Sequence, residues 1–313
     1  MKTIKPVISI IIINYNTKEL LWQCINSILQ NDKRLTFSPN ISNFKNEAYI
    51  PAEIIIIDNG STDGSVKMIN HQLSTITHRP LAIKLIKNQT NLGFGKANNR
   101  GMQVAKGEYI LLLNSDTEVK EGAISQTLLW FSSHPEFDII GCKLINPDGC
   151  IQPSAGKFPT LINVCRMLFF DRIIKKRQVM FSPKKITKVD WIMGAFMLLR
   201  KEVFRKSKGF DENIFMYMEE VEWCYRLKKF GFRIGFYPNA KIIHFGGASS
   251  KRGVPIINIY RGLIYFYQKH KSKNELFILK LMLKVKALLS LSLGIISNND
   301  YLKKTYQQAL AIS

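Results

Sequence analysis

Apolar runs alternate with helix-like segments through the first half of the chain, and this rhythm limits the folds open to it. The runs that favour strands are Val7–Ile13, Glu53–Ile57, Leu81–Lys87 and Tyr109–Leu113. The segments that favour helices are Lys18–Gln30, Asp63–Gln72 and Gly95–Ala105. A βαβαβαβ order predicts an α/β fold, a parallel sheet with helices on its faces. Ligands of such sheets bind beyond the carboxyl ends of the strands, so the polar residues after each strand are the site candidates.

The second half is less regular. Its predicted strands are Phe137–Ile145, Ala195–Leu199, Phe232–Tyr237 and Lys241–His244, and its predicted helix is Tyr217–Phe230. Residues 31–52 are predicted to be a polar insertion, because they show little periodicity.

Length and composition predict one large domain, or a domain with an appendage. The chain has 313 residues, and 46% of them are hydrophobic, enough for a sizeable core. Its five cysteines are scattered and form no C-x-x-C pair, which argues against a disulfide framework and a zinc site. We therefore expect a reducing compartment, the cytosol. The apolar run at Val7 leads into Asn14-Tyr15-Asn16 without a cleavage site, which favours a buried strand over a signal peptide.

The charge of the chain implies an anionic partner. Its formal net charge is +22. Residues 172–188 hold seven basic residues and no acid, and residues 251–313 hold eleven basic and two acidic residues. Nucleic acid, an anionic membrane and phosphorylated small molecules all fit this bias. No helix-turn-helix, RRM or zinc-finger signature accompanies it, and acids at the strand ends would repel phosphates, so we expect no nucleic-acid partner.

The C-terminal region contains a long apolar segment, residues 275–296, interrupted by Lys280, Lys284 and Lys286. Three lysines make a membrane-spanning helix costly. An amphipathic helix is expected instead, either docked on the domain, in contact with a second copy, or lying on a membrane surface.

Polar residues follow each predicted strand. Tyr15, after the first, could stack on a nucleobase, although a core tyrosine is the commoner case. Asp58, after the second, could accept hydrogen bonds from a base N–H or a ribose hydroxyl. Asp63 could serve as a helix N-cap instead. After the third strand, the glycines in residues 91–101 allow close backbone approach to a ligand.

Asp116 follows a strongly apolar run, where a carboxylate is costly unless it is solvated, paired or metal-bound. One carboxylate together with substrate phosphates suits Mg²⁺ or Mn²⁺. Farther along, Glu219, Glu220 and Glu222 form an acidic cluster. The cluster either complements a helix N-terminus or supplies a general base, and both interpretations stay open at this point. A lone histidine such as His244 is more often structural than a ligand.

In this order, seven segments resemble the inverting glycosyltransferase family 2, in particular its rhamnosyltransferase-like branch. They are IIINYN, IIIIDNGSTDGS, NLGFGKANNRG, YILLLNSDTEV, WIMGAFMLLRKEVF, GFDENIFMYMEEVEWCYRLKKFG and KIIHFGGAS. The resemblance implies a GT-A fold, with a mainly parallel central sheet, flanking helices and a C-terminal helical extension. It divides the chain into a catalytic domain, residues 1–250, and a basic amphipathic helical tail, residues 251–313. Residues 1–115 would form the nucleotide-binding half of the catalytic domain and residues 116–250 its acceptor and catalytic half.

The resemblance also implies roles for individual residues. Glu220 matches the catalytic base, and Asp116 and His244 match the positions that hold the metal. The residues implied for nucleotide-sugar binding are Tyr15, Asn16, Asp58, Asn91, Gly93, Lys96, Asn98, Asn114 and Asp116. Those implied for the acceptor or the transferred sugar are Trp191, Gly194, Asp211 and Glu219.

Two motifs depart from the family pattern. The D-x-D motif is Asn114-Ser115-Asp116 here, so one of its carboxylates remains. The usual E-D-V-D is Glu219-Glu220-Val221-Glu222 here. Because the side chain of Glu220 is longer than that of the usual aspartate, its backbone must lie slightly farther from the acceptor.

The implied reaction moves a sugar from a nucleoside-diphosphate sugar, dTDP-rhamnose or a UDP-hexose, to a hydroxyl of a glycan or lipid-linked glycan. The implied setting is cell-surface polysaccharide synthesis at the inner face of the plasma membrane. A relative that binds nucleotide-sugar or membrane with little turnover is the alternative.

Overall fold

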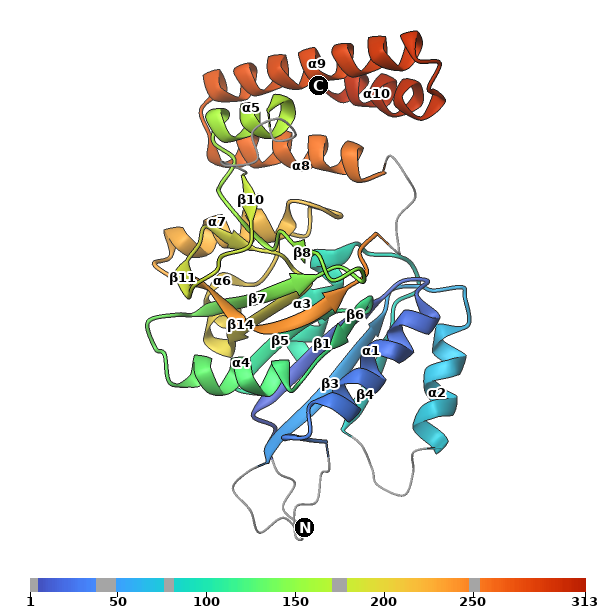
Figure 1. Cartoon of the computed structure of the whole chain (residues 1–313), viewed down its shortest axis with the longest axis vertical. Helices are drawn as coiled ribbons and strands as arrows, with labels where there is room; N and C mark the ends of the chain where they lie inside the picture. The colour runs from blue at the N-terminus through green and yellow to red at the C-terminus, as the bar shows by residue number, and fades with distance from the viewer. Residues whose placement is uncertain (1–4, 38–48, 76–81, 171–178, 248–253) are drawn as a thin grey trace.

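The computed structural model describes residues 5–37, 49–75, 82–170, 179–247 and 254–313. A mixed β-sheet forms the centre, helices cover both of its faces, and a separate helical layer lies at one end (Figure 1). The strand order of the sheet is β11-β14-β7-β13-β5-β1-β3-β2, with β4 beside β3, β6 beside β14 and β8 beside β7.

The predicted parallel strands are confirmed. β1 (Ile8–Asn14) lies between β3 (Ile50–Asp58) and β5 (Tyr109–Asn114), and β3 also pairs with β2 (Leu35–Thr36) and β4 (Ile83–Lys87), always in parallel. The intervening helices are α1 (Lys18–Asn31), α2 (Ser65–Thr75) and α3 (Phe94–Val104). β1 consists of isoleucines apart from Ser9 and Asn14, as expected of a strand that is buried on both faces. The predicted polar insertion, residues 31–52, contains β2 and the start of β3, and residues 38–48 lie outside the described chain.

The second half of the sheet is mixed. β13 (Phe196–Arg200) runs antiparallel between β5 and β7 (Ile139–Ile145), and β14 (Ile234–His244) runs parallel to β7. The two short strands predicted around residues 232–244 are in fact this one strand, with an irregularity between Tyr237 and Lys241. Pro238 lies in that gap, and proline has no N–H to donate to a ladder. β6 (Thr117–Val119), β8 (Ile151–Gln152) and β11 (Thr187–Lys188) extend the sheet, and β9 (Ala155–Gly156), β10 (Met180–Phe181) and β12 (Trp191–Ile192) form a small second sheet.

Two apolar cores lie on opposite faces of the central sheet. One packs α1 and α4 (Ala123–Ser132) against Ile10 and Ile12. The other packs α3, α6 (Lys201–Ser207) and α7 (Glu219–Lys229) against Ile11. Successive residues of β1 thus point alternately into one core and the other, as the two-residue period of a strand requires.

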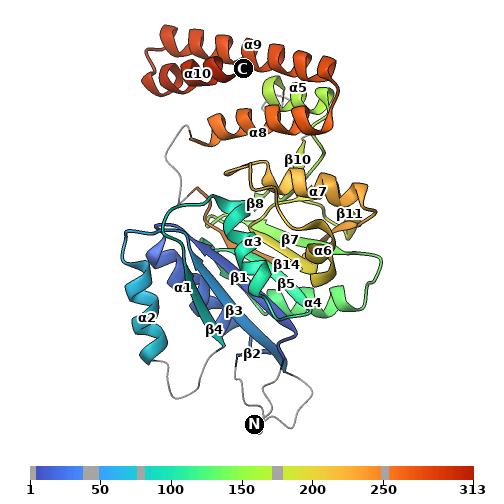
Figure 2. The ribbon, with the colours of Figure 1, turned by 180° about the vertical axis from the view of Figure 1, so that it is seen from behind.

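The helical layer has a core of its own. It comprises α8 (Val254–His270), α9 (Lys273–Ile296) and α10 (Asp300–Ile312), joined by α5 (Leu161–Phe169) from the middle of the chain. Figures 1 and 2 show this layer at the end of the molecule, with α9 outermost. Across the described residues, none of the helices is both long enough and apolar enough to cross a membrane.

Glu222 ties this layer to the central domain. Its carboxylate is fully buried and accepts hydrogen bonds from Arg226 Nε at 2.9 Å, on the same helix. It also accepts from Lys269 Nζ at 2.9 Å and contacts His270 Nε2 at 3.0 Å, both on α8. The third acid of the cluster therefore has a structural role, because its oxygens are committed to these three partners.

We expect Glu222→Gln to lower the free energy of unfolding by about 2 kcal/mol, because the fully buried carboxylate loses its charged hydrogen bonds to Arg226 and Lys269. Urea-induced unfolding measures this change. The control is Glu202→Gln, which removes an exposed i,i+4 pair with Lys206 and should change stability by less than about 0.5 kcal/mol. Equal stability of the two variants would contradict the structural role of Glu222.

Candidate active site

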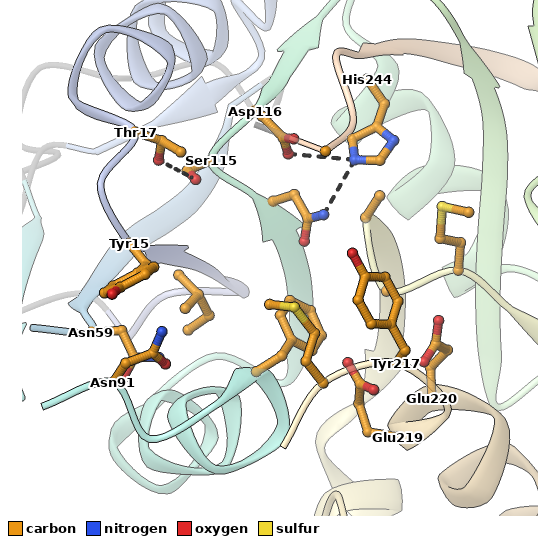
Figure 3. A pocket seen from close by; sticks show the side chains of 18 residues that line it. Tyr15, Thr17, Asn59, Asn91, Ser115, Asp116, Tyr217, Glu219, Glu220 and His244 are labelled. Atoms are coloured by element: carbon orange, nitrogen blue, oxygen red, sulfur yellow. Dashed lines mark hydrogen bonds and ion pairs between the residues drawn. The ribbon is translucent and has the colours of Figure 1, made fainter. Parts of the chain in front are cut away.

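A cavity of about 220 Å³ opens at the carboxyl edge of the parallel strands. Figure 3 shows Tyr15, Asn59 and Asn91 on one side of it, Tyr217, Glu219 and Glu220 on another, and Asp116 with His244 at a third. The remaining lining residues are Ile13, Thr17, Phe94, Asn114, Ser115, Met193, Gly194, Ala195, Met216 and Gly247. The cavity is where the parallel sheet predicts a ligand.

Strand register brings the strand-end residues together. Asn14 pairs with Asp58 across β1 and β3, and Ile13 pairs with Asn114 across β1 and β5. Asp58 is buried beneath the cavity wall, where it accepts hydrogen bonds from Asn14 Nδ2 at 2.9 Å and Ser61 N at 3.1 Å. Asp58 therefore fixes the loops that carry Tyr15, rather than lining the cavity itself.

Asn16 and Asp63 hold the same two loops in place. Asn16 Oδ1 accepts from Thr62 N at 2.8 Å. Asp63 accepts from the first amides of two helices, Lys18 N at 2.8 Å and Ser65 N at 3.0 Å. Asp63 lies one residue before the expected N-cap position, since α2 begins at Ser65, but it still accepts from the first amide of that helix. Its hydrogen bonds to Ser65 and Lys18 outweigh burial and lower its pKa.

Asn91 lines the cavity in a fixed orientation. Its Oδ1 accepts from Asn59 Nδ2 at 2.8 Å and from Gly93 N at 2.9 Å. The amide group therefore has a defined donor direction before any ligand arrives.

The glycines of this loop make room for protein backbone. A Cβ on Gly93 would lie 2.3 Å from the carbonyl oxygen of Phe215, and one on Gly95 would lie 2.9 Å from Cβ of Phe210. The amide of Phe94 also donates to the Phe215 carbonyl at 2.9 Å. Their interpretation as glycines that admit a ligand is therefore corrected: what they admit is the segment that leads to α7.

Asp116 and His244 lie next to each other on one side of the cavity (Figure 3). His244 Nε2 lies 3.4 Å from Asp116 Oδ1 and 3.3 Å from Asn114 Nδ2, while His244 Nδ1 lies 2.7 Å from Gln152 Oε1. In the neutral imidazole, donation from Nδ1 to Gln152 leaves the Nε2 lone pair directed at Asp116 and Asn114. Two electron-rich atoms this close to each other suit a cation between them.

The donor set fits a hard cation with open positions. Asn114 Oδ1 is buried and, among the described residues, has no hydrogen-bond partner. Asp116, His244 and this oxygen supply ligands of the types that Mg²⁺ and Mn²⁺ accept. The described residues contain no group of three or more His, Cys, Asp or Glu side chains placed to hold a metal, so a cation here needs phosphate or water oxygens as well.

A strained turn presents the acidic pair. Tyr217 and Met218 have φ of 66° and 75°, left-handed values that cost a non-glycine residue about 1–3 kcal/mol each. The helix predicted from Tyr217 consequently begins at Glu219. Gly262 of α8 packs against this turn, since a Cβ there would lie 2.7 Å from Met218 Cβ. The helical layer thus supports the turn from behind.

Glu219 and Glu220 are held in an environment that favours protonation. Glu219 is buried and Glu220 half-buried, and each has one buried carboxylate oxygen without a partner among the described residues. Burial raises the pKa of Glu220 to about 7. Burial, reinforced by the adjacent Glu220, raises the pKa of Glu219 well above its ordinary value. At neutral pH this pair is suited to exchanging a proton.

Several residues implied by the family resemblance lie outside the cavity lining. Trp191 is buried over Gly156 and donates to the Lys157 carbonyl at 3.0 Å. Asp211 is bonded to Tyr265 and Lys269 of α8, and these bonds lower its pKa. Lys96 pairs with Glu212 at 3.5 Å, and Asn98 donates to the Phe94 carbonyl at 3.0 Å. In the structure their polar atoms make these contacts within the protein, and their expected contacts with substrate stay predictions.

The structure adds residues that the sequence did not single out. Gln152 orients His244, and Tyr217 projects from the strained turn toward the cavity (Figure 3). Thr17 and Ser115 share a 2.8 Å hydrogen bond in the cavity wall. Gln152 gave no signal, because it lies 92 residues from its partner; Tyr217 could have been suspected from its place beside the acidic cluster.

Comparison with known proteins agrees with this geometry. A family model described as glycosyl transferase family 2 matches residues 9–207. The N-acetylglucosaminyl-diphospho-decaprenol L-rhamnosyltransferase of Mycobacterium tuberculosis is 30% identical over 220 residues, which is 64% of this chain and 69% of that protein. Rhamnosyltransferase WbbL of Escherichia coli is 30% identical over 49% of this chain and 61% of its own length.

Solved structures show the same fold at low identity. The mannosyltransferase PcManGT of Pyrobaculum calidifontis, in complex with GDP-Man and Mn²⁺, has a TM-score of 0.55 and 16% identity, covering 99% of this chain and 86% of that one. Residues 1–349 of TarS from S. aureus, in complex with UDP, have a TM-score of 0.51 and 17% identity, covering 92% and 73%. The chain therefore belongs to glycosyl transferase family 2 and is a glycosyltransferase with the GT-A fold.

Proposed function

We propose that this enzyme transfers a sugar from a nucleoside-diphosphate sugar to an acceptor hydroxyl with inversion. One observation carries the proposal: a single cavity holds a cation-binding pair, Asp116 and His244, and a separate pair of raised-pKa carboxylates, Glu219 and Glu220. Inverting transfer needs both parts, one for the leaving diphosphate and one for the attacking hydroxyl.

The donor would occupy the side of the cavity formed by the strand ends. Tyr15 offers a ring for the base, and Asn91 offers an oriented amide. Asp58 supports these loops and stays a candidate for contact with the ribose or base through its remaining lone pairs. Gly194 also lines the cavity, and an added Cβ there would lie 2.9 Å from the Phe94 ring, so the glycine makes room for that ring. Its contact with the transferred sugar stays a prediction.

Asp116 and His244 would hold Mg²⁺ or Mn²⁺ together with the diphosphate. Such a cation, when bound, neutralises the charge that develops on the leaving group. Two solved structures of this fold, PcManGT and GalNAc-T7, contain Mn²⁺, which supports the proposal. Gln152 keeps the Nε2 lone pair of His244 directed toward Asp116.

Glu220 would accept the proton of the acceptor hydroxyl as that oxygen attacks the sugar. Glu219 lies next to it, and two buried carboxylates so placed do not readily ionise together. The negative charge that Glu220 carries when deprotonated thus raises the pKa of its neighbour.

The relatives favour particular substrates. Two are rhamnosyltransferases, and one is named for an acceptor with a diphospho-decaprenol carrier. We propose dTDP-rhamnose ahead of a UDP-hexose as donor, and a lipid-linked glycan as acceptor, at the cytoplasmic face of the plasma membrane. A binding protein with little turnover is the alternative, because one carboxylate of the usual D-x-D motif is missing.

We expect Glu220→Gln to lower kcat by about 10²–10⁴-fold with little change in KM, because it removes the base and keeps the shape. For the unmodified enzyme, kcat/KM should fall as the pH drops below about 7, since Glu220 is then protonated. Steady-state transfer assays across pH measure both. The control is Glu136→Gln, an exposed acid outside the cavity. Loss of activity in Glu219→Gln but not in Glu220→Gln would reassign the base.

We expect Asp116→Ala to reduce both transfer and donor hydrolysis by at least about 10²-fold, because the diphosphate loses its cation. Chelation of divalent cations should reduce the unmodified enzyme similarly, and nucleoside diphosphate release measures each case. Asp148→Ala, in an exposed turn, is the matched control. Normal turnover by Asp116→Ala at saturating Mn²⁺ would remove Asp116 from the site, and no donor hydrolysis by the unmodified protein with any tested donor would favour the binding alternative.

A further inference from the structure

Helix α9 is apolar on two opposite faces. One face packs into the helical layer through Leu279, Leu283 and Ala287. The opposite face, which we call the outward face, consists of exposed apolar side chains. Its members are Phe277, Leu281, Val285, Leu288, Leu289 and Ile295, each between 41% and 71% exposed.

The outward face is continuous along the helix. Phe277, Leu281, Leu288 and Ile295 are separated by four, seven and seven residues, the spacing of one helical stripe. Single exposed apolar residues are ordinary on protein surfaces, but a contiguous stripe of this length marks an interaction surface.

The fold directs this stripe away from the catalytic domain. α9 packs against α5, α8 and α10 on its inner side. Both views of the ribbon place α9 at the outer end of the molecule (Figures 1 and 2). Because the inner side is covered, the outward face meets whatever lies beyond the helical layer.

Lysines follow one border of the outward face. Lys273, Lys280 and Lys284 are separated by seven and four residues and so lie along one line of the helix, beside Phe277 and Leu288. After Glu275, α9 contains no acidic residue, and residues 251–313 carry eleven basic against two acidic residues. Long lysine side chains at such a border place their ammonium groups in a polar layer while the stems cover apolar surface.

The positive charge around the outward face favours an anionic binding partner. A second copy of the chain would bring an equally basic surface, and each copy has a net charge of +22. An anionic lipid surface offers both negative headgroups and an apolar interior.

We propose that α9 lies in the plane of an anionic membrane, with its outward face among the acyl chains and its lysine border among the headgroups. This extends the proposed function, in which the acceptor carries a lipid. The layer that binds lipid also supports the catalytic turn, because Gly262 of α8 packs against Met218. Membrane contact and the acidic pair are thereby joined through one packed unit.

The test compares the full chain with the double variant Leu281→Gln, Leu288→Gln in flotation assays. Vesicles of phosphatidylcholine alone are compared with vesicles that contain about 30 mol% phosphatidylglycerol. The intact chain should bind the anionic vesicles at least about tenfold more tightly than the double variant, because two apolar side chains no longer enter the membrane. High salt should release the intact chain only in part, and Lys280→Gln with Lys284→Gln should weaken the salt-sensitive part.

The matched control is Leu129→Gln with Phe230→Gln, two exposed apolar residues on the catalytic domain, which should leave vesicle binding unchanged. Donor hydrolysis without vesicles separates this inference from the proposed function: normal hydrolysis with no vesicle binding would overturn the membrane surface alone, and vesicle binding without hydrolysis would overturn the enzyme mechanism alone. Equal vesicle binding by the intact chain and the double variant would also overturn the proposed membrane surface. So would self-association in solution that the double variant abolishes while neither protein binds vesicles.

Discussion

The backbone pairing of β1 with β3 and β5 is the constraint on which the site depends. Parallel strands in register must end at the same edge, so Asn14, Asp58 and Asn114 meet there although they are far apart in the chain. Their side chains then fix the loops that follow, through the bonds from Asp58 to Asn14 and Ser61. Because β1 is buried on both faces, shifting its register would disrupt both cores at once. The side of the cavity formed by the strand ends is therefore held in place by this pairing.

The opposite side of the cavity is built differently. A strained turn at Tyr217 and Met218 aims the acidic pair, and such a backbone persists only when its surroundings hold it. Those surroundings come from the helical layer: Gly262 packs on the turn, and the cations of α8 bond to Glu222. The tail thus helps to support the acidic pair, and the buried carboxylate of Glu222, bonded to residues of both helices, holds α8 against α7.

Much of the fold was predictable, because hydrophobic periodicity reports burial directly. The four parallel strands and their helices follow from it, and so do Tyr15, Asn114 and Asp116 as strand-end residues of the cavity. Roles that depend on distant partners were not predictable in this way. Asp211 and Trp191 were expected beside the substrate, yet each bonds within the protein. Gly93 was expected to admit a ligand, and it admits the backbone of Phe215.

By itself, the sequence determined the α/β rhythm, the polar residues at the strand ends, the long apolar segment that forms most of α9 and the basic charge of its region. These features are encoded locally, in patterns of two or about four residues. Only the tertiary structure decided which two acids of the cluster face the cavity, which one bonds to α8, and which face of α9 is left uncovered. It also recruited α5 from the middle of the chain into the helical layer. Such choices depend on contacts between distant segments, and a local pattern cannot specify its own partner.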